Sequence, residues 1–187
     1  MPAQSTIDRL CRVPKNKALF WSGSATTILY PYRDQIGLVT DKTAYPAGYT
    51  ERYRNPDGSQ RDPIKDRLFA KRFSMAFAKK ATGEVRLIVP WETGPNPNRF
   101  FHSVEWPVLK RSLARGRVTK IIQVNPSNVQ ETREYDPRRY GLSKRAESML
   151  SKRAVEIDFD NIPWDADLDA VAERWRQVHK NTKPPRL

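Results

Sequence analysis

Cysteine and histidine are scarce in this sequence. Its 187 residues include one cysteine, Cys11, and two histidines, His102 and His179. A single thiol cannot form an internal disulfide, so the fold does not depend on an oxidising compartment. Two histidines far apart in sequence offer no metal-ligand cluster and no histidine-based triad, so we expect neither a metal nor that kind of catalysis.

Long apolar runs are also missing. No segment approaches the roughly 20 apolar residues that a membrane span needs. The opening residues, MPAQSTIDRLCRV, lack the apolar core of a signal peptide. We therefore expect the cytoplasm as the site of action, with no membrane partner.

Positive charge is what the sequence has in excess. Lys and Arg total 34 against 21 Asp and Glu, for a formal net charge of +13. Such an excess favours anionic partners, which include nucleic acid, an acidic protein and phosphorylated small molecules. The charge is spread along the whole chain, so a solvated basic surface is an equally good interpretation.

Helix and strand patterns alternate along the chain. Apolar periodicity predicts helices over 5–13, 63–80, 108–113, 140–151 and 165–180. Continuous apolar runs predict strands over 85–89, 118–124 and 155–159. Residues 31–62 are rich in proline and glycine and are predicted to be mostly loop, with Pro31 interrupting a helix that begins near Ser24.

This alternation predicts an α/β fold in one domain over residues 1–187. We expect a helix-rich N-terminal part packed on a small, mainly parallel sheet that is flanked by helices. In open parallel sheets, ligands bind beyond the carboxyl ends of the strands. The loop at 90–106, which follows the strand ending at Val89, is therefore the expected position of a site.

That loop concentrates side chains that carry chemistry. Its last sixteen residues, WETGPNPNRFFHSVEW, include two tryptophans, two phenylalanines and two glutamates. We expect the part from Phe100 to Trp106 to be extended or turn-like and to be ended by Pro107. Cleavage of an N-glycosidic bond to a cationic base requires a carboxylate to stabilise the ribosyl cation and aromatic faces to hold the ring. Glu105 and Glu92 are both candidates for that carboxylate. A loop that merely covers the sheet with its aromatic residues is the competing interpretation.

Three segments resemble the ADP-ribosyl cyclase family of NAD-consuming enzymes, and they come in the family's order. Leu19-Phe20-Trp21-Ser22 is similar to an early tryptophan–serine motif whose tryptophan stacks on nicotinamide. The segment 69–89 resembles the family's helix and strand, and Ser103-Val104-Glu105 resembles the Ser-Val-Glu that carries the catalytic glutamate. The resemblance covers about residues 18–125, and 126–187 would add a C-terminal strand and helices.

The resemblance implies an NAD glycohydrolase that uses NAD as its substrate and needs no cofactor. It implies Glu105 as the catalytic carboxylate, and it places Asp41, in Thr40-Asp41-Lys42-Thr43, where the family has a glutamate that tunes cyclisation against hydrolysis. The candidate substrate-binding residues are Trp21, Ser22, Arg33, Trp91, Phe101 and Trp106.

Two departures from the family shape these expectations. The family's second active-site tryptophan is missing, because residues 49–68 contain none. Trp91, Trp106, Tyr49 and Tyr53 are candidate replacements, and without one we expect hydrolysis to prevail over formation of cyclic ADP-ribose. The chain also lacks the disulfides of animal members, so it resembles microbial relatives that include toxin domains, for which an acidic immunity protein would be the partner.

Two other classes of function compete with this interpretation. A basic nucleic-acid-binding or nuclease toxin domain is favoured by the net charge but disfavoured by the shortage of histidine for general acid–base catalysis. A non-enzymatic module would use residues 90–106 as a partner-binding loop.

Overall fold

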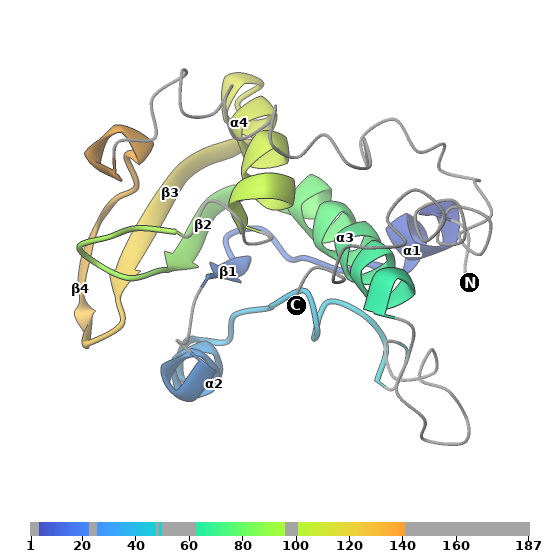
Figure 1. The fold of residues 1–187 in the computed structure, drawn as a ribbon, viewed down its shortest axis with the longest axis horizontal. Coiled ribbons are helices and arrows are strands. Elements are labelled where there is room, and N and C mark those ends of the chain that lie inside the picture. Colours follow the sequence, from blue (N-terminus) through green and yellow to red (C-terminus); the bar gives the residue numbers. More distant parts are fainter. Residues whose placement is uncertain (1–3, 23–25, 48, 50–62, 96–100, 141–187) are drawn as a thin grey trace, which may run out of the picture.

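The computed structural model describes residues 4–22, 26–47, 49, 63–95 and 101–140, in which helices and strands alternate (Figure 1). The helices are α1 (Gln4–Leu10), α2 (Thr26–Ile36), α3 (Pro63–Lys80), the π-helical turn η2 (Phe101–Glu105), α4 (Trp106–Ala114) and the 3-10 turn η3 (Pro137–Tyr140). The strands are β1 (Leu19–Trp21), β2 (Gly83–Ile88), β3 (Val118–Asn125) and β4 (Asn128–Glu134).

The four strands form one sheet in the order β1-β2-β3-β4. β1 runs parallel to β2 and β2 parallel to β3, whereas β4 returns antiparallel to β3. The expected α/β fold with a mainly parallel sheet is therefore confirmed. Because Trp21 pairs with Ile88, the carboxyl ends of β1 and β2 lie at the same edge of the sheet.

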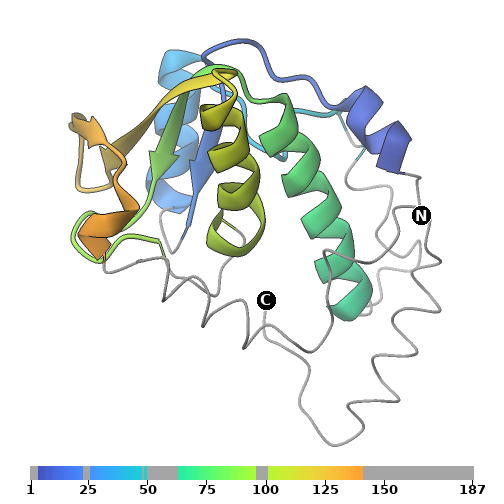
Figure 2. The same cartoon turned by 90° about the horizontal axis from the view of Figure 1, so that it is seen from above.

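Helices cover both faces of this sheet. α3 and α4 lie side by side on one face, and α2 lies on the other (Figure 1, Figure 2). Successive strand residues point to opposite faces, so Phe20 packs in the core beneath α3 and α4, while Leu19 packs with residues of α2. In β2, Leu87 and Ile88 divide between the two cores in the same way. Burial on both faces explains why the run at 85–89 is almost continuously apolar.

The elements with strong patterns are found where the sequence predicts them. α3 spans the predicted 63–80 and begins with Pro63, whose missing N–H costs nothing in the first turn of a helix. β2 and β3 match the predicted strands at 85–89 and 118–124. The predicted strand at 155–159 and the predicted helix at 165–180 lie outside the described residues, as do Ser24, Tyr53 and residues 141–151.

Two predictions involving proline are wrong. α2 continues through Pro31 to Ile36, so Pro31 does not interrupt the helix and less of 31–62 is loop than expected. The described part of the segment from Phe100 to Trp106 is turn-like rather than extended, because residues 101–105 form a π-helical turn, but Pro107 does not end it. Pro107 lies in the first turn of α4, where proline is favoured, and so it marks the start of that helix rather than the end of an extended segment.

Two further features complete the described structure. β4 has no counterpart among the predicted strands. No helix among the described residues is both long enough and apolar enough to cross a membrane.

Gly83 provides a test of how the sheet is joined to the N-terminal loop. It has a φ of +71°, and a Cβ added there would lie 2.1 Å from Asn16 Oδ1. This oxygen accepts a hydrogen bond from the Glu84 backbone N–H at 2.7 Å. We predict that Gly83→Ala lowers the free energy of unfolding by roughly 2–3 kcal/mol, from backbone strain plus displacement of Asn16.

The matched control is Gly116→Ala. Gly116 has a similar φ of +68°, but nothing lies within 4 Å of an added Cβ. We expect Gly116→Ala to lower the free energy of unfolding by about 1 kcal/mol, because only the left-handed backbone conformation opposes the new side chain. Urea unfolding measures both variants, and equal losses would show that the contact with Asn16 contributes nothing.

Candidate active site

Glu105 lies at the start of α4, as the last residue of the π-helical turn. α4 is the crossover helix between the parallel strands β2 and β3. In such a unit the helix begins at the carboxyl end of the preceding strand. Glu105 is therefore at the edge of the sheet where β1 and β2 end, next to a helix N-terminus whose dipole favours negative charge.

The Glu105 side chain is buried, with only 6% of the residue exposed. Burial raises the pKa of its carboxyl well above the usual range, and the negative charge of Asp41 raises it further. A side-chain hydrogen bond with Ser74 of α3 acts in the opposite direction and favours the carboxylate. α3, α4 and the turn at Asp41 thus meet at one carboxyl group.

Asp41 lies in a tight turn after α2. The Thr40 backbone N–H donates to Thr43 Oγ1 at 2.9 Å, which fixes this turn. Burial raises the pKa of Asp41 to about 6, against the opposing charge of Lys42. The Oδ1 atom of Asp41 is buried and accepts no hydrogen bond from a described residue.

The structure brings Asp41 and Glu105 close enough for their charges to interact, although they are far apart in sequence. The interaction is between like charges, and the negative charge of Asp41 raises the pKa of Glu105. Neither carboxyl forms an ion pair with a basic residue in the described part of the chain. Because a buried charge without an opposite partner is costly, this arrangement would favour a ligand that supplies a positive charge.

Trp21 and Ser22 reach the same edge of the sheet from β1. The Ser22 N–H donates to the Ile88 carbonyl at 3.0 Å, and its buried Oγ has no hydrogen-bond partner among the described residues. Trp21 is half-buried and packs with the residues that α2 covers, on the face of β1 opposite to Phe20. The edge therefore offers one unsatisfied hydroxyl and one partly exposed indole.

Phe101 and Trp106, which flank Glu105 in the sequence, are both buried. The Phe101 ring lies 6.2 Å from Phe20 and 5.9 Å from Tyr135, and the Trp106 ring lies 5.3 Å from Tyr135. These contacts give both residues a packing role that holds the start of α4 in place. Tyr49, a candidate replacement for the missing tryptophan, is buried against Tyr45 and Phe73.

Trp91 follows β2 in a loop that a polar network anchors. The Arg133 guanidinium lies 3.7 Å from the centre of the Trp91 ring and donates a hydrogen bond to the Trp91 carbonyl. Arg133 also donates to Tyr140 Oη at 2.7 Å, and that hydroxyl donates to Gln123 Oε1 at 2.5 Å. One face of the Trp91 ring is therefore covered by a cation from β4.

Arg33 is held on its own helix. It forms an ion pair with Asp34 at 2.6 Å and its guanidinium lies 5.1 Å from the centre of the Tyr30 ring. All three residues belong to α2.

Sequence reasoning did not select Ser74 as a site residue. Ser74 is a buried hydroxyl on the face of α3 that also carries Phe73 and Phe77. A polar residue at a core-facing position of an amphipathic helix is the signal that would have identified it, because buried hydroxyls require partners.

Known proteins were compared with the whole chain. No family model and no curated protein matches it. Among solved structures, it is similar to ADP-ribosyl cyclase complexed with N1-cIDPR (25% identity, TM-score 0.44) and to a glutamate-to-alanine mutant of ADP-ribosyl cyclase (25%, 0.43). It is also similar to Aplysia cyclase complexed with the substrate NGD and the product cGDPR (26%, 0.39). Each match covers 58% of this chain and 48% of the other, so the chain spans about half the length of these cyclases.

The burial of Glu105 has a consequence for stability. Its pKa is higher in the folded than in the unfolded protein, so the folded state binds the extra proton and stability falls as pH rises above about 4.3, the unfolded value. Glu105→Gln removes this cost. We predict that it raises Tm at pH 8 by roughly 2–4 °C, the effect of about 1 kcal/mol in a protein of this size, with a smaller gain at pH 4.5.

The exposed Glu92 of the following loop supplies the matched control. Glu92→Gln should leave Tm unchanged at both pH values. The Tm of both variants is measured by thermal unfolding, with circular dichroism as the signal. A lower Tm for Glu105→Gln at pH 8 would mean that the ionised carboxylate stabilises the fold.

Proposed function

We propose that this protein cleaves the nicotinamide–ribose bond of NAD and releases nicotinamide and ADP-ribose. The observation that carries the proposal is the buried Glu105 carboxyl, which lies beside Asp41 at the carboxyl edge of a parallel sheet and has no cationic partner among the described residues. The residues resembling the cyclase motifs, at Trp21-Ser22 and at Ser103-Val104-Glu105, support the same reaction.

The chemistry of NAD suits such a site. Its nicotinamide ring carries a positive charge and leaves as a neutral molecule, so it needs no general acid. As the C1′–N bond breaks, the electron pair goes to the ring nitrogen and the positive charge moves to the ribosyl group. A fixed carboxylate in a water-poor pocket stabilises that developing charge. Water then adds to C1′ and its proton is released, which completes the hydrolysis.

The raised pKa of Glu105 fits a cationic substrate. In the free protein, burial and Asp41 favour the protonated acid. The cationic ring of NAD would bring the opposite charge, lower the pKa and favour the carboxylate. The Ser74 hydrogen bond, which also favours the carboxylate, would then hold it in position.

The roles proposed for the remaining residues combine their positions with the resemblance to the cyclase motifs. Trp21 would contact the nicotinamide ring with its exposed part, and Ser22 would donate its unpaired hydroxyl to the sugar–phosphate portion. Asp41 would set the protonation of Glu105 and the choice between water and cyclisation. With no second tryptophan at the expected position, hydrolysis should exceed cyclisation. An NAD-depleting enzyme of this kind would act as a toxin effector in the cytoplasm of a target cell, with an acidic immunity protein as its natural inhibitor.

The first functional prediction isolates the charge of Glu105. The purified protein should convert NAD to nicotinamide and ADP-ribose, and Glu105→Gln should lower kcat by roughly a hundredfold or more, as expected for loss of a preorganised electrostatic group. NAD affinity should change much less. Chromatography of the products, with NAD binding measured by calorimetry, tests both statements.

Glu92→Gln is the control for this experiment, because Glu92 follows β2 but is exposed. It should retain full activity. If Glu92→Gln is inactive and Glu105→Gln active, the catalytic carboxylate has been misassigned. An unmodified protein that leaves NAD intact refutes the proposal.

The second functional prediction concerns pH. Catalysis requires ionised Glu105, so kcat/KM should fall as pH decreases through the pKa of Glu105 in the free enzyme. Asp41→Asn removes the negative charge that raises this pKa. The acidic limb of the profile, normalised to its plateau, should therefore move to lower pH. An unmoved limb would show that Asp41 does not act on the catalytic group.

A further inference from the structure

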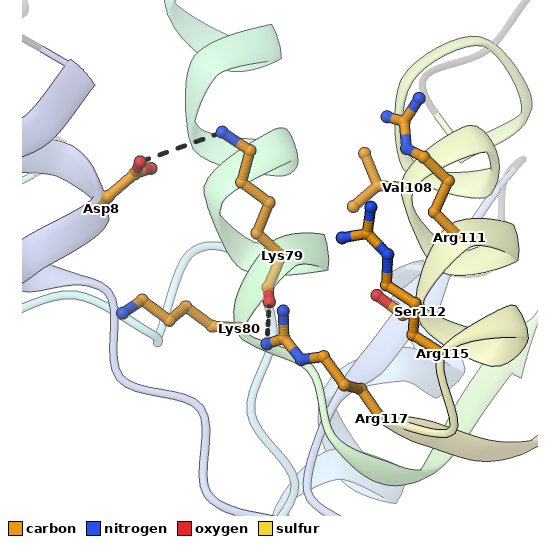
Figure 3. A pocket seen from close by; sticks show the side chains of 8 residues that line it. All are labelled: Asp8, Lys79, Lys80, Val108, Arg111, Ser112, Arg115 and Arg117. Atoms are coloured by element: carbon orange, nitrogen blue, oxygen red, sulfur yellow. Dashed lines mark hydrogen bonds and ion pairs between the residues drawn. The ribbon is translucent and has the colours of Figure 1, made fainter.

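A basic pocket lies between α3 and α4. It has a volume of about 410 Å³ and is lined by Asp8, Lys79, Lys80, Val108, Arg111, Ser112, Arg115 and Arg117 (Figure 3). Lys79 and Arg115 stand on opposite sides of the space between the two helices. The pocket therefore gathers five cationic side chains around one concave surface.

Few of these charges are neutralised within the described part of the chain. Lys79 lies 3.9 Å from Asp8, and Arg117 donates to the Lys79 carbonyl at 2.7 Å. Lys80, Arg111 and Arg115 form no ion pair with any described residue. The residues lining the pocket carry five positive charges and one negative charge, a net charge of +4.

The helix dipoles account for only part of this excess. α3 and α4 end at the pocket, and each C-terminus carries a partial charge of about −0.5, which basic side chains in the last turn offset. Two helix ends therefore offset about one of the positive charges. The remaining excess is more than helix capping requires.

The charged residues that line the pocket lie toward the opposite end of α4 from Glu105, and only Val108 belongs to the first turn of this helix. Lys79, Lys80 and Arg115 come from the ends of the helices, immediately before β2 and β3 begin. α4 has nine residues, so at 1.5 Å per residue its two ends are about 14 Å apart. The pocket is thus separate from the edge where Glu105, Asp41 and Ser22 lie.

The lining residues restrict the class of ligand. Arginine guanidinium groups bind phosphate oxygens with two parallel hydrogen bonds, and three arginines are present. None of the eight lining residues is aromatic, and Val108 is the only aliphatic one, so the pocket offers no aromatic surface on which a base could stack. Recognition would depend on dense negative charge rather than on a nucleobase.

From this combination we infer that the pocket between α3 and α4 binds a small polyphosphate, a compound with several adjacent phosphate groups and no recognised base. Arg111 and Arg115 are the principal ligands, since neither guanidinium group has a hydrogen-bond or ion-pair partner among the described residues. Asp8 opposes binding, because its carboxylate lies at the same pocket and repels the anion.

Inorganic triphosphate is the probe, and calorimetry with the full chain at low salt is the measurement. Arg111→Ala and Arg115→Ala should each weaken binding about tenfold, the loss of one charge-assisted interaction. Asp8→Asn should strengthen binding about threefold, as relief of repulsion between partly exposed charges predicts. A gain of affinity in one variant and a loss in two others cannot arise from general unfolding.

Arg139→Ala is the matched control, because Arg139 is an exposed arginine on η3 outside the pocket. It should bind triphosphate as the unmodified protein does. NAD turnover should stay within twofold in Arg111→Ala and Arg115→Ala, so this inference and the proposed NAD cleavage fail independently.

Four results would overturn the inference. The first is equal affinity in the unmodified protein and both arginine variants. The second is displacement of triphosphate by NAD, which would assign the pocket to the substrate site. The third is binding of ATP more than ten times tighter than triphosphate. The fourth is binding of a short RNA more than ten times tighter than triphosphate, with this preference lost in Arg111→Ala. The pocket would then be a nucleic-acid binding surface.

Discussion

The burial of the Glu105 carboxyl is the constraint around which the described structure is arranged. The carboxyl can remain in the core because α3 supplies the Ser74 hydroxyl, α4 supplies a helix N-terminus and the turn after α2 supplies Asp41. Two of these features favour the ionised form, while Asp41 and burial oppose it. The pKa of this group is therefore set by parts of the chain that only the tertiary fold brings together.

The packing around η2 serves the same purpose. Phe101 and Trp106 bracket Glu105 in sequence, and both rings are fixed against Tyr135, which follows β4. Arg133, at the end of β4, holds the Trp91 loop through its carbonyl and its ring. The antiparallel strand at the edge of the sheet thus supports both ends of the connection between β2 and α4. Aromatic residues that suggested a binding surface in the sequence thus also pack around the segment that carries the carboxyl group.

The regular elements could be predicted from the sequence, because their apolar patterns are local. The features that depend on tertiary contacts could not. α3 and β2 carry long, unambiguous apolar patterns. Pro107 was misread because proline both ends extended segments and begins helices, and local sequence does not distinguish the two. β4 reads NVQETRE and has Val129 as its only aliphatic residue, so it shows no hydrophobic pattern to detect. Glu105 and Asp41 were selected through family resemblance, whereas the role of Ser74 depends on how α3 packs against α4.

The distribution of charge also favours a cationic substrate. The chain has 34 basic residues, and a buried carboxylate would ordinarily be paired with one of them. In the described part of the chain, five of the basic residues gather at the far end of α3 and α4, and neither Asp41 nor Glu105 forms an ion pair. An arginine beside Glu105 would keep the carboxyl ionised at every relevant pH and would neutralise it before a ligand arrived. Without one, Glu105 still lacks the opposite charge that a cationic ring would bring. Binding energy can then be used to ionise the group that the reaction needs.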